Sequence, residues 1–147
     1  MPSIVATIGF TKTSAQGFFT RLTDAGVKRV IDVRLHNTSQ LAGFAKAEDL
    51  GYFLKQLGGI DYVHEPLLAP TDAMLKTYRT EKTGWDSYAE RFLDLLRERR
   101  IERLLSPEGL DRACLLCSEA SAHHCHRRLV VDYLNEQWGG TLAVTHL

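Results

Sequence analysis

The sequence lacks an excess of charge of either sign. Its 18 lysines and arginines balance 18 aspartates and glutamates, which gives a formal net charge of zero and a pI near 7.0. Proteins that bind nucleic acid or membrane surfaces through bulk electrostatics carry an excess of positive charge. That mode of binding is excluded, and only a local basic patch could replace it. No apolar run approaches the roughly 20 residues of a membrane span, so we expect no membrane partner.

Cysteine is scarce, and the first residues do not have the pattern of a secretory leader. The opening MPSIVATIG has neither the charged start nor the long apolar stretch of a signal peptide. Cys114, Cys117 and Cys125 are the three cysteines, and they crowd into a dozen positions. An odd and crowded set is typical of thiols kept for chemistry or metal binding in a reducing compartment. We therefore expect a cytoplasmic protein without a disulfide framework.

The motifs of common nucleotide and hydrolase chemistry are also missing. Gly9 stands alone before the first helical pattern, without a GxGxxG or P-loop lysine motif. The phosphatase arrangement of cysteine, five residues and arginine fails, because His123 and Val131 stand six positions beyond Cys117 and Cys125. No GxSxG or HExxH segment occurs. The sequence thus identifies no cofactor, and it leaves the binding of a metal open.

Short segments rich in β-branched residues alternate with helical patterns along the chain. Nearly continuous apolar strands suit a sheet that is covered on both faces, and the connections are long enough for parallel neighbours. No linker or repeat divides the chain. The sequence predicts one α/β domain over residues 1–147, a three-layer sandwich with a mainly parallel sheet of about five strands and helices on both faces. The expected strands are 4–8, 28–33, 60–64, 112–117 and 141–146.

Apolar stripes at helical spacing predict the helices between these strands. Ser14 is placed to cap the first, and Gly26 stands just past its end. The last helix is expected to begin near His124 or Cys125 and to bury Leu129, Val130, Tyr133 and Leu134. The other helices are expected around 50–57, from 70–72 and over 85–100. Strand order and oligomeric state do not follow from these patterns.

Unusual polar residues gather where the predicted strands end. In an open parallel sheet, ligands bind outside the carboxyl ends of the strands. Four segments reach this edge, and they are 9–13, 32–34, 64–66 and 117–128. This convergence is the main functional signal of the sequence.

The segment from Cys117 to Arg128 carries the densest chemistry. Free N–H groups at a helix start favour an anion, and a cysteine there, beside histidine and arginine, has its thiolate favoured. Arg127 or Arg128 could add a charge-assisted hydrogen bond to the anion. We expect a small enzyme or ligand-binding domain for an anionic, phosphate- or nucleotide-like ligand. The candidate catalytic residues are Cys117, Cys125, His64 and Glu119, and the candidate ligand-binding residues are Thr11, Arg34, His126 and Arg127.

Within this hypothesis, either Cys117 or Cys125 is the nucleophile, and His64 or Glu119 moves the proton. Several of the same residues also have a structural interpretation. Arg34 could clamp loops together, Asp32 could orient a loop backbone, and Cys114 is expected to be a buried apolar residue.

Two alternatives use the same edge. In the first, Cys117, Cys125, His64 and His126 form a tetrahedral metal site, although spacing supports this only weakly. Cys114 and Cys117 do not make a metal knuckle, because positions three apart on a strand face opposite sides. In the second, the domain binds nucleic acid without catalysis, which the neutral charge disfavours.

The segments TIGFT, IDVR, IDYVHEPLL and LLCSEASAHHCHRRLVVDYL resemble the DUF488 family of small bacterial and archaeal proteins. The resemblance covers essentially the whole chain in order. It implies an α/β domain without an assigned reaction. The family's characteristic positions correspond here to 7–9, 32–34, Tyr62, His64, Cys117, Glu119 and 125–127.

Overall fold

All five strands lie in one parallel sheet with the order β3-β2-β4-β1-β5. The structure is a computed structural model that describes residues 3–11, 13–36, 45–80, 84–117 and 125–147. Each predicted strand is present, and no observed strand boundary differs from the predicted one by more than one residue. The prediction of an α/β fold is confirmed. The strands are β1 (Ser3–Gly9), β2 (Arg29–Asp32), β3 (Asp61–His64), β4 (Ala113–Cys117) and β5 (Leu142–His146).

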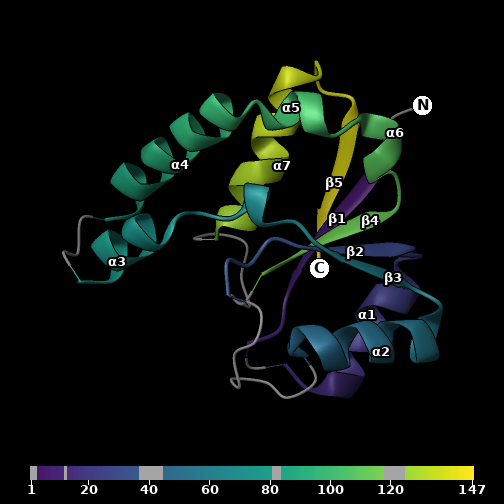
Figure 1. The fold of residues 1–147 in the computed structure, drawn as a ribbon. Coiled ribbons are helices and arrows are strands. Elements are labelled where there is room, and N and C mark those ends of the chain that lie inside the picture. The colour runs from purple at the N-terminus through teal and green to yellow at the C-terminus, as the bar shows by residue number, and fades with distance from the viewer. Residues whose placement is uncertain (1–2, 12, 37–44, 81–83, 118–124) are drawn as a thin grey trace.

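Helices cover both faces of this sheet (Figure 1). Helices α1 and α2 lie on one face, and α5 and α7 lie on the other. None of the helices in the described ranges is long and apolar enough to cross a membrane. The helices are α1 (Ala15–Asp24), α2 (Ala47–Gly58), α3 (Asp72–Thr80), α4 (Trp85–Arg99), α5 (Ile101–Leu104), α6 (Pro107–Leu110) and α7 (His126–Gln137), with a 3-10 turn η2 (Pro66–Leu68).

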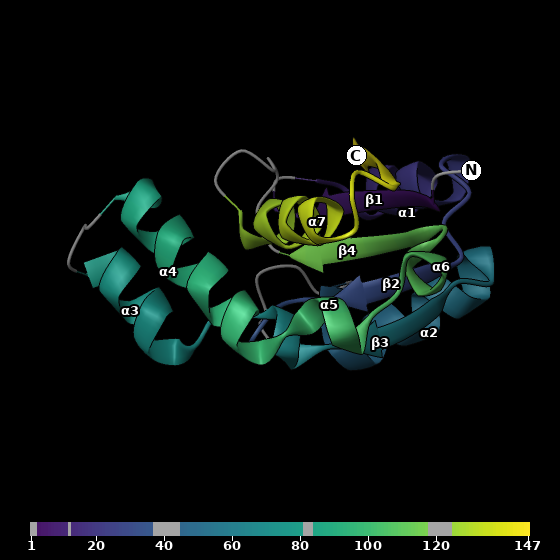
Figure 2. The ribbon, with the colours of Figure 1, turned by 90° about the horizontal axis from the view of Figure 1, so that it is seen from above.

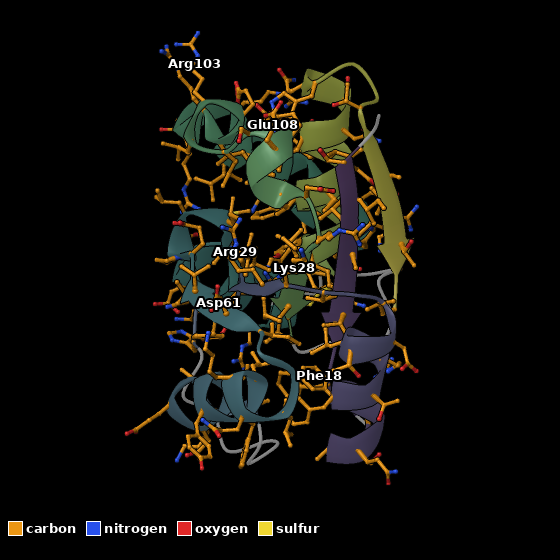
Figure 3. The ribbon with its side chains drawn as sticks, turned by 90° about the vertical axis from the view of Figure 1, so that its right-hand side faces the viewer. Phe18, Lys28, Arg29, Asp61, Arg103 and Glu108 are labelled. Carbon is orange, nitrogen blue, oxygen red and sulfur yellow. A yellow bond between two sulfur atoms is a disulfide. The ribbon has the colours of Figure 1, made fainter. Side chains whose placement is uncertain are left out.

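The sheet separates two apolar cores. On β4, Leu115 and Cys117 face the core beneath α4 and α7, whereas Cys114 and Leu116 face the core beneath α1 and α2. Phe18 of α1 is fully buried in this second core (Figure 3). Because strand side chains alternate between faces, an apolar run such as ACLLC fills both cores at once.

The direction of the chain across the sheet reverses after β3. The path from β1 through β2 to β3 runs toward one edge, and the path from β3 through β4 to β5 runs back toward the other. Right-handed crossovers in opposite directions place their helices on opposite faces, which is the arrangement observed. The helices that follow β1 and β2 therefore lie on one face and the helix that follows β4 lies on the other, and ligands in open α/β sheets bind at the carboxyl ends of neighbouring strands that differ in this way.

Some sequence-based details of the helices and edge strands are wrong. Leu129 is only partly buried on α7, and Val131 is fully buried in its place, because α7 begins at His126 with Cys125 as its N-cap. Arg100 adopts a left-handed backbone with φ of 54°, which ends α4 before the short helix α5. The edge strands β3 and β5 are partly exposed rather than covered on both faces.

Helices α3 and α4 form a hairpin that projects beyond the sheet. Figure 2 shows this hairpin extending past the ends toward which β2 and β4 point. At the opposite edge, where the strands begin, Arg29 of β2 (Figure 3) donates a hydrogen bond to the carbonyl of Gly109 on α6. The carboxyl edge thus lies beside the hairpin and carries the candidate site.

Candidate functional site

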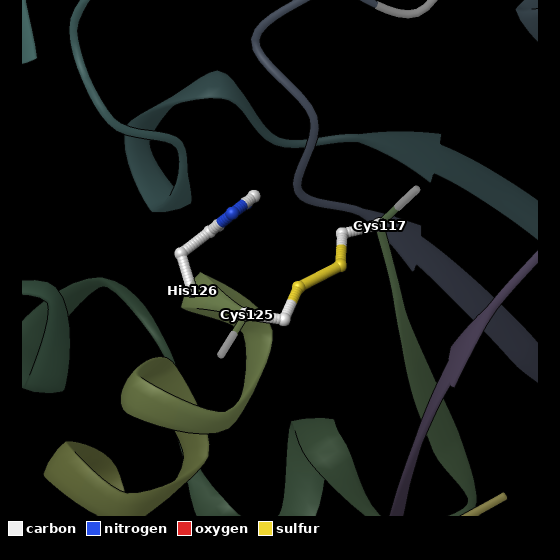
Figure 4. A group of neighbouring side chains, drawn as sticks. All are labelled: Cys117, Cys125 and His126. Carbon is white, nitrogen blue, oxygen red and sulfur yellow. A yellow bond between two sulfur atoms is a disulfide. The ribbon is translucent and has the colours of Figure 1, made fainter. Parts of the chain in front are cut away.

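Cys117 and Cys125 meet at the carboxyl edge (Figure 4). Cys117 ends the central strand β4, and Cys125 precedes the first turn of α7. Their sulfur atoms are joined in a disulfide across eight positions of sequence. The expectation of unpaired thiols is therefore wrong for this pair, because the return of the chain from β4 into α7 places the two positions together. Spacing along the sequence does not reveal that return.

Cys114 is a free cysteine on the other side of β4. Its side chain is fully buried in the core beneath α1 and α2, as predicted for an apolar residue. Burial raises the pKa of its thiol, since the charged form is poorly solvated there. Cys114 is thus a buried thiol on the same strand as Cys117, and it can serve as an internal reference for the other two cysteines.

His126 lies beside the cysteine pair at the start of α7. Its Nε2 donates a hydrogen bond of 2.7 Å to the carbonyl of Val33, which follows β2. A carbonyl can only accept, so Nε2 carries the hydrogen and Nδ1 presents a lone pair when the ring is neutral. Burial lowers the pKa of His126 to about 4, and the neighbouring Arg127 charge acts in the same direction. The ring is therefore neutral at physiological pH.

The ligand atoms of Cys117, Cys125 and His126 all lie within 4.8 Å of one another. Once the disulfide is reduced, these atoms are two cysteine sulfurs and one imidazole nitrogen, a donor set that suits a thiophilic metal. His64 is outside this group, so the structure assembles three of the four residues of the predicted metal site. The group as described therefore has three donors.

Arg127, in the first turn of α7, contacts the sulfur atom of Cys117. Its side chain is fully buried, and its Nη1 donates to Cys117 Sγ at 3.2 Å. The sequence left Arg127 and Arg128 as alternatives, and Arg128 instead is exposed and pairs with Asp132 at 3.5 Å. A guanidinium at this distance stabilises a thiolate on Cys117 relative to the thiol.

Arg34 is engaged in a buried network after β2. Its Nε and Nη2 donate to the two carboxylate oxygens of Asp32 at 2.9 and 2.8 Å, and Nη2 also donates to the Ala45 carbonyl at 2.7 Å. Its guanidinium lies over the Phe10 ring, 5.1 Å from the centroid. Tyr62 of β3 donates its hydroxyl to Asp32 at 2.5 Å. This geometry matches the structural interpretation of Arg34, whose role in binding an anion stays a prediction.

Asp32 also orients the backbone, as the sequence predicts. Its Oδ1 accepts from the backbone N–H of Arg34 at 3.1 Å. His64 Nε2 donates to the Arg34 carbonyl at 2.7 Å, next to the Val33 carbonyl that His126 contacts. Two histidines from different elements thus hold consecutive carbonyls beyond β2. Their convergence confirms that the ends of β2, β3 and β4 meet at one edge.

Two candidates remain, Thr11 and Glu119. Thr11 is partly buried two residues beyond Gly9, and Gly9 is paired in register with Cys117. Glu119 lies outside the described residues. The catalytic and ligand-binding roles of both residues stay predictions.

A row of aromatic side chains on the α3–α4 hairpin reaches His126, although none of them is among the site residues predicted from the sequence. The Phe92 ring meets the His126 ring edge-on at 5.6 Å, and Tyr88 stacks on Phe92 at 6.2 Å. Trp85 and Tyr78 continue the row from Tyr88, at 5.4 and 4.8 Å. In the sequence, Trp85, Tyr88 and Phe92 stand at helical spacing, a pattern that by itself indicates only a packing face of a helix.

A cavity of about 410 Å³ lies elsewhere, against α1 and α2. Phe19, Phe53 and Leu57 contribute to its apolar lining, and no residue of the cysteine cluster does so. The titratable and nucleophilic groups therefore lie apart from this cavity, and the cluster is the stronger candidate for chemistry.

Comparison with family models gives one result that spans most of the chain. The model described as a domain of unknown function, DUF488, matches residues 14–134. Neither the comparison with curated proteins nor the comparison with solved structures gives a significant match.

Proposed function

This chain belongs to the DUF488 family, and from that premise we propose that it is a small thiol-dependent enzyme or ligand-binding domain. The ligand is a small anion of the phosphate or nucleotide type, and it binds at the carboxyl edge of the sheet. One observation supports this most strongly: the buried guanidinium of Arg127 donates to Cys117 Sγ at 3.2 Å. A cation beside a thiol is the arrangement that lowers a thiol pKa and increases nucleophilicity at neutral pH.

In the reduced protein, Cys117 is the attacking thiolate. Arg127 supplies the positive charge that stabilises the thiolate and attracts an anionic ligand, and the N-terminus of α7 adds N–H donors. Cys125 is close enough to form a disulfide with Cys117, so it can protect or resolve an oxidised nucleophile. His64 and Glu119 stay the proposed proton carriers, and Thr11, Arg34 and His126 the proposed ligand contacts.

Access to the sulfur atoms controls this chemistry. Cys117 is 1% exposed and Cys125 is 3% exposed. A ligand reaches them only when the neighbouring segments move apart, and such opening has a lower free energy than global unfolding in many proteins. Cys114 provides the matched reference, because it lies on the same strand but faces the opposite core, away from Arg127 and the start of α7.

The test is competitive alkylation of the reduced protein with iodoacetamide, read by peptide mass mapping. We expect Cys117 and Cys125 to react well before Cys114, and inorganic phosphate or a nucleoside monophosphate to slow the reaction of Cys117. Arg127→Gln should reduce the rate at which Cys117 reacts near pH 7 by about tenfold, because the positive charge beside its sulfur is removed.

Arg128→Gln is the control, since Arg128 is exposed and pairs with Asp132 instead. Circular dichroism of each variant checks that it is folded. Equal reaction rates at the three cysteines, or a Cys117 rate that no tested anion and no Arg127 substitution changes, would contradict the proposal.

Nucleic-acid binding stays an alternative prediction. The balance of 18 basic against 18 acidic residues continues to disfavour it. A partner of this class would show itself by salt-dependent binding to single-stranded or duplex DNA.

A further inference from the structure

We propose that the reduced cluster of Cys117, Cys125 and His126 is a metal site for one thiophilic divalent ion of the zinc type. The inference depends on the proposed function only in that both use the same two thiols. Metal binding needs no anionic ligand and no nucleophilic attack. The two proposals can therefore fail separately.

The distance between the Cα atoms of the two cysteines is longer than that of most disulfides, and it suits two cysteines that share a metal ion. Their Cα atoms are 7.6 Å apart, whereas disulfides usually span about 4.4–6.8 Å between Cα atoms. Zinc–sulfur bonds of about 2.3 Å in a tetrahedron hold two sulfur atoms about 3.8 Å apart. Reduction of the pair releases the sulfur atoms to that separation, while the backbone positions of Cys117 and Cys125 stay in place.

The hydrogen bond of His126 prepares the third ligand. Its Nε2–H is fixed on the Val33 carbonyl at 2.7 Å, which leaves Nδ1 as the nitrogen that can bind a metal. Metal-binding histidines commonly donate their other N–H to a carbonyl or carboxylate, which sets the ring orientation. Phe92 packs edge-on against the same ring at 5.6 Å and restricts its rotation.

Arg127 serves the site as a partner of one ligand. Its Nη1 donates to Cys117 Sγ at 3.2 Å, which favours the deprotonated sulfur that a metal requires. Each thiol loses one proton when the ion binds, so two thiolates balance the charge of a divalent ion. Hydrogen bonds of this kind to coordinating atoms tune metal affinity.

The donor types define the class of ion. Two thiolates and an imidazole select zinc and similar ions, whereas calcium and magnesium require oxygen ligands. Within the described residues the group contains three protein donors. Three protein ligands and one exchangeable position are the arrangement of catalytic zinc sites. The fourth position is open to water or to a small anion.

Oxidation and metal binding exclude each other at this cluster. A peroxide oxidises the two thiolates, which lose two electrons and form the Cys117–Cys125 bond. The peroxide O–O bond breaks, and its oxygens take up the two electrons and two protons to become water. The disulfide holds no thiolate, so the ion is released. The bonded pair in the structure corresponds to this oxidised state.

The experiment uses the untagged full chain, reduced and freed of metal with a chelator, and titrates it with Co²⁺ without oxygen. We expect one Co²⁺ per chain, a sulfur-to-cobalt charge-transfer band, the visible bands of tetrahedral cobalt, and displacement by one equivalent of Zn²⁺. The oxidised protein should give no such spectrum, and this comparison needs no variant.

Substitutions then identify the ligands. Cys117→Ser, Cys125→Ser and His126→Gln should each weaken Co²⁺ binding at least about tenfold, whereas Cys114→Ser should bind like the wild type. Substoichiometric binding, a spectrum without the charge-transfer band, or unchanged binding in Cys125→Ser would overturn the metal site. If the metal site is overturned in this way but anions still slow the alkylation of Cys117, the proposed function is supported without a metal. Binding of one Co²⁺ per chain, with no effect of anions on the alkylation of Cys117, would support the metal site and contradict the proposed function.

Discussion

The carboxylate of Asp32 is fully buried, yet four donors surround it. Three belong to Arg34 and the fourth is the Tyr62 hydroxyl. A buried ion pair is tolerated when hydrogen bonds satisfy it in this way, although it adds little net stability. Its effect is geometric, because the network fixes the backbone whose carbonyls receive His126 and His64. Asp32 and Arg34 thus position the residues around the cysteines.

His126 should make the stability of the oxidised protein depend on pH. Its folded pKa of about 4 lies below the ordinary value of 6.5 that applies when the chain unfolds. Above pH 6.5 neither state binds the proton. Between pH 6.5 and 4 only the unfolded state binds it, so the free energy of unfolding falls as the pH falls, by about 3 kcal/mol over the window. Urea unfolding at a series of pH values measures this slope.

The variant His126→Gln should flatten this part of the curve, because the group that titrates is removed. His36→Gln is the control, since His36 is exposed and pairs with Asp72 at the surface. A slope that survives His126→Gln and disappears with His36→Gln would contradict the assignment. Acid sensitivity from carboxylates is common to all three proteins and cancels in the comparison.

At the scale of elements, the start of α1 is fixed by one side chain. The Ser14 hydroxyl accepts from the Gly17 backbone N–H at 3.0 Å, as the sequence predicts for a cap. Ser14→Ala should therefore reduce the free energy of unfolding by about 1 kcal/mol. Thr20→Ala on the exposed side of the same helix should change it by less than about 0.5 kcal/mol. Equal effects in chemical denaturation would show that the cap contributes nothing.

The start of α7 differs from that of α1. The N-cap Cys125 makes no side-chain capping hydrogen bond, and the first two residues of α7 contact the segments that end β2 and β4. The first turn therefore contributes chemical groups to the site, with His126 and Arg127 both directed at neighbouring strands. Helix start signals locate such a turn approximately, but they do not say which of its residues points inward. Arg127 is buried and Arg128 is exposed for this reason.

At the scale of the whole molecule, β4 is the centre of both cores. Leu115 and Leu116 are adjacent, both are fully buried, and they face opposite sides of the sheet. Leu115→Ala and Leu116→Ala should each reduce the free energy of unfolding by about 2–5 kcal/mol. Val63→Ala on the edge strand β3, where the side chain is 39% exposed, should reduce it by less than about 1 kcal/mol.

Calorimetric or urea unfolding of these three variants measures the difference. A large loss for one leucine and a negligible loss for the other would mean that one face of the sheet is not a core. A loss at Val63 as large as at the leucines would contradict its edge position. Both results would argue against the three-layer arrangement.

The reversal of the chain after β3 explains how distant segments become neighbours. The order β3-β2-β4-β1-β5 inserts β4 between β1 and β2, so Cys117 lies next to Gly9 on one side and near Val33 on the other. The α3–α4 hairpin that precedes β4 brings Phe92 against His126. No local pattern in the sequence specifies this order, because it depends on packing between segments that are far apart in the sequence.

The amino-acid sequence by itself determined the class of fold, the five strands, the cap at Ser14 and the edge of the sheet at which the candidate residues meet. These features depend on local periodicity and on the general rule that parallel strands end at one edge, and both are legible along the chain. Only the tertiary structure decided that Cys117 and Cys125 lie within bonding distance, that Arg127 rather than Arg128 faces the sulfur, and that Arg34 is engaged by Asp32. Those outcomes depend on strand order and on the rotation of α7 about its axis, which are set by packing between segments far apart in the sequence.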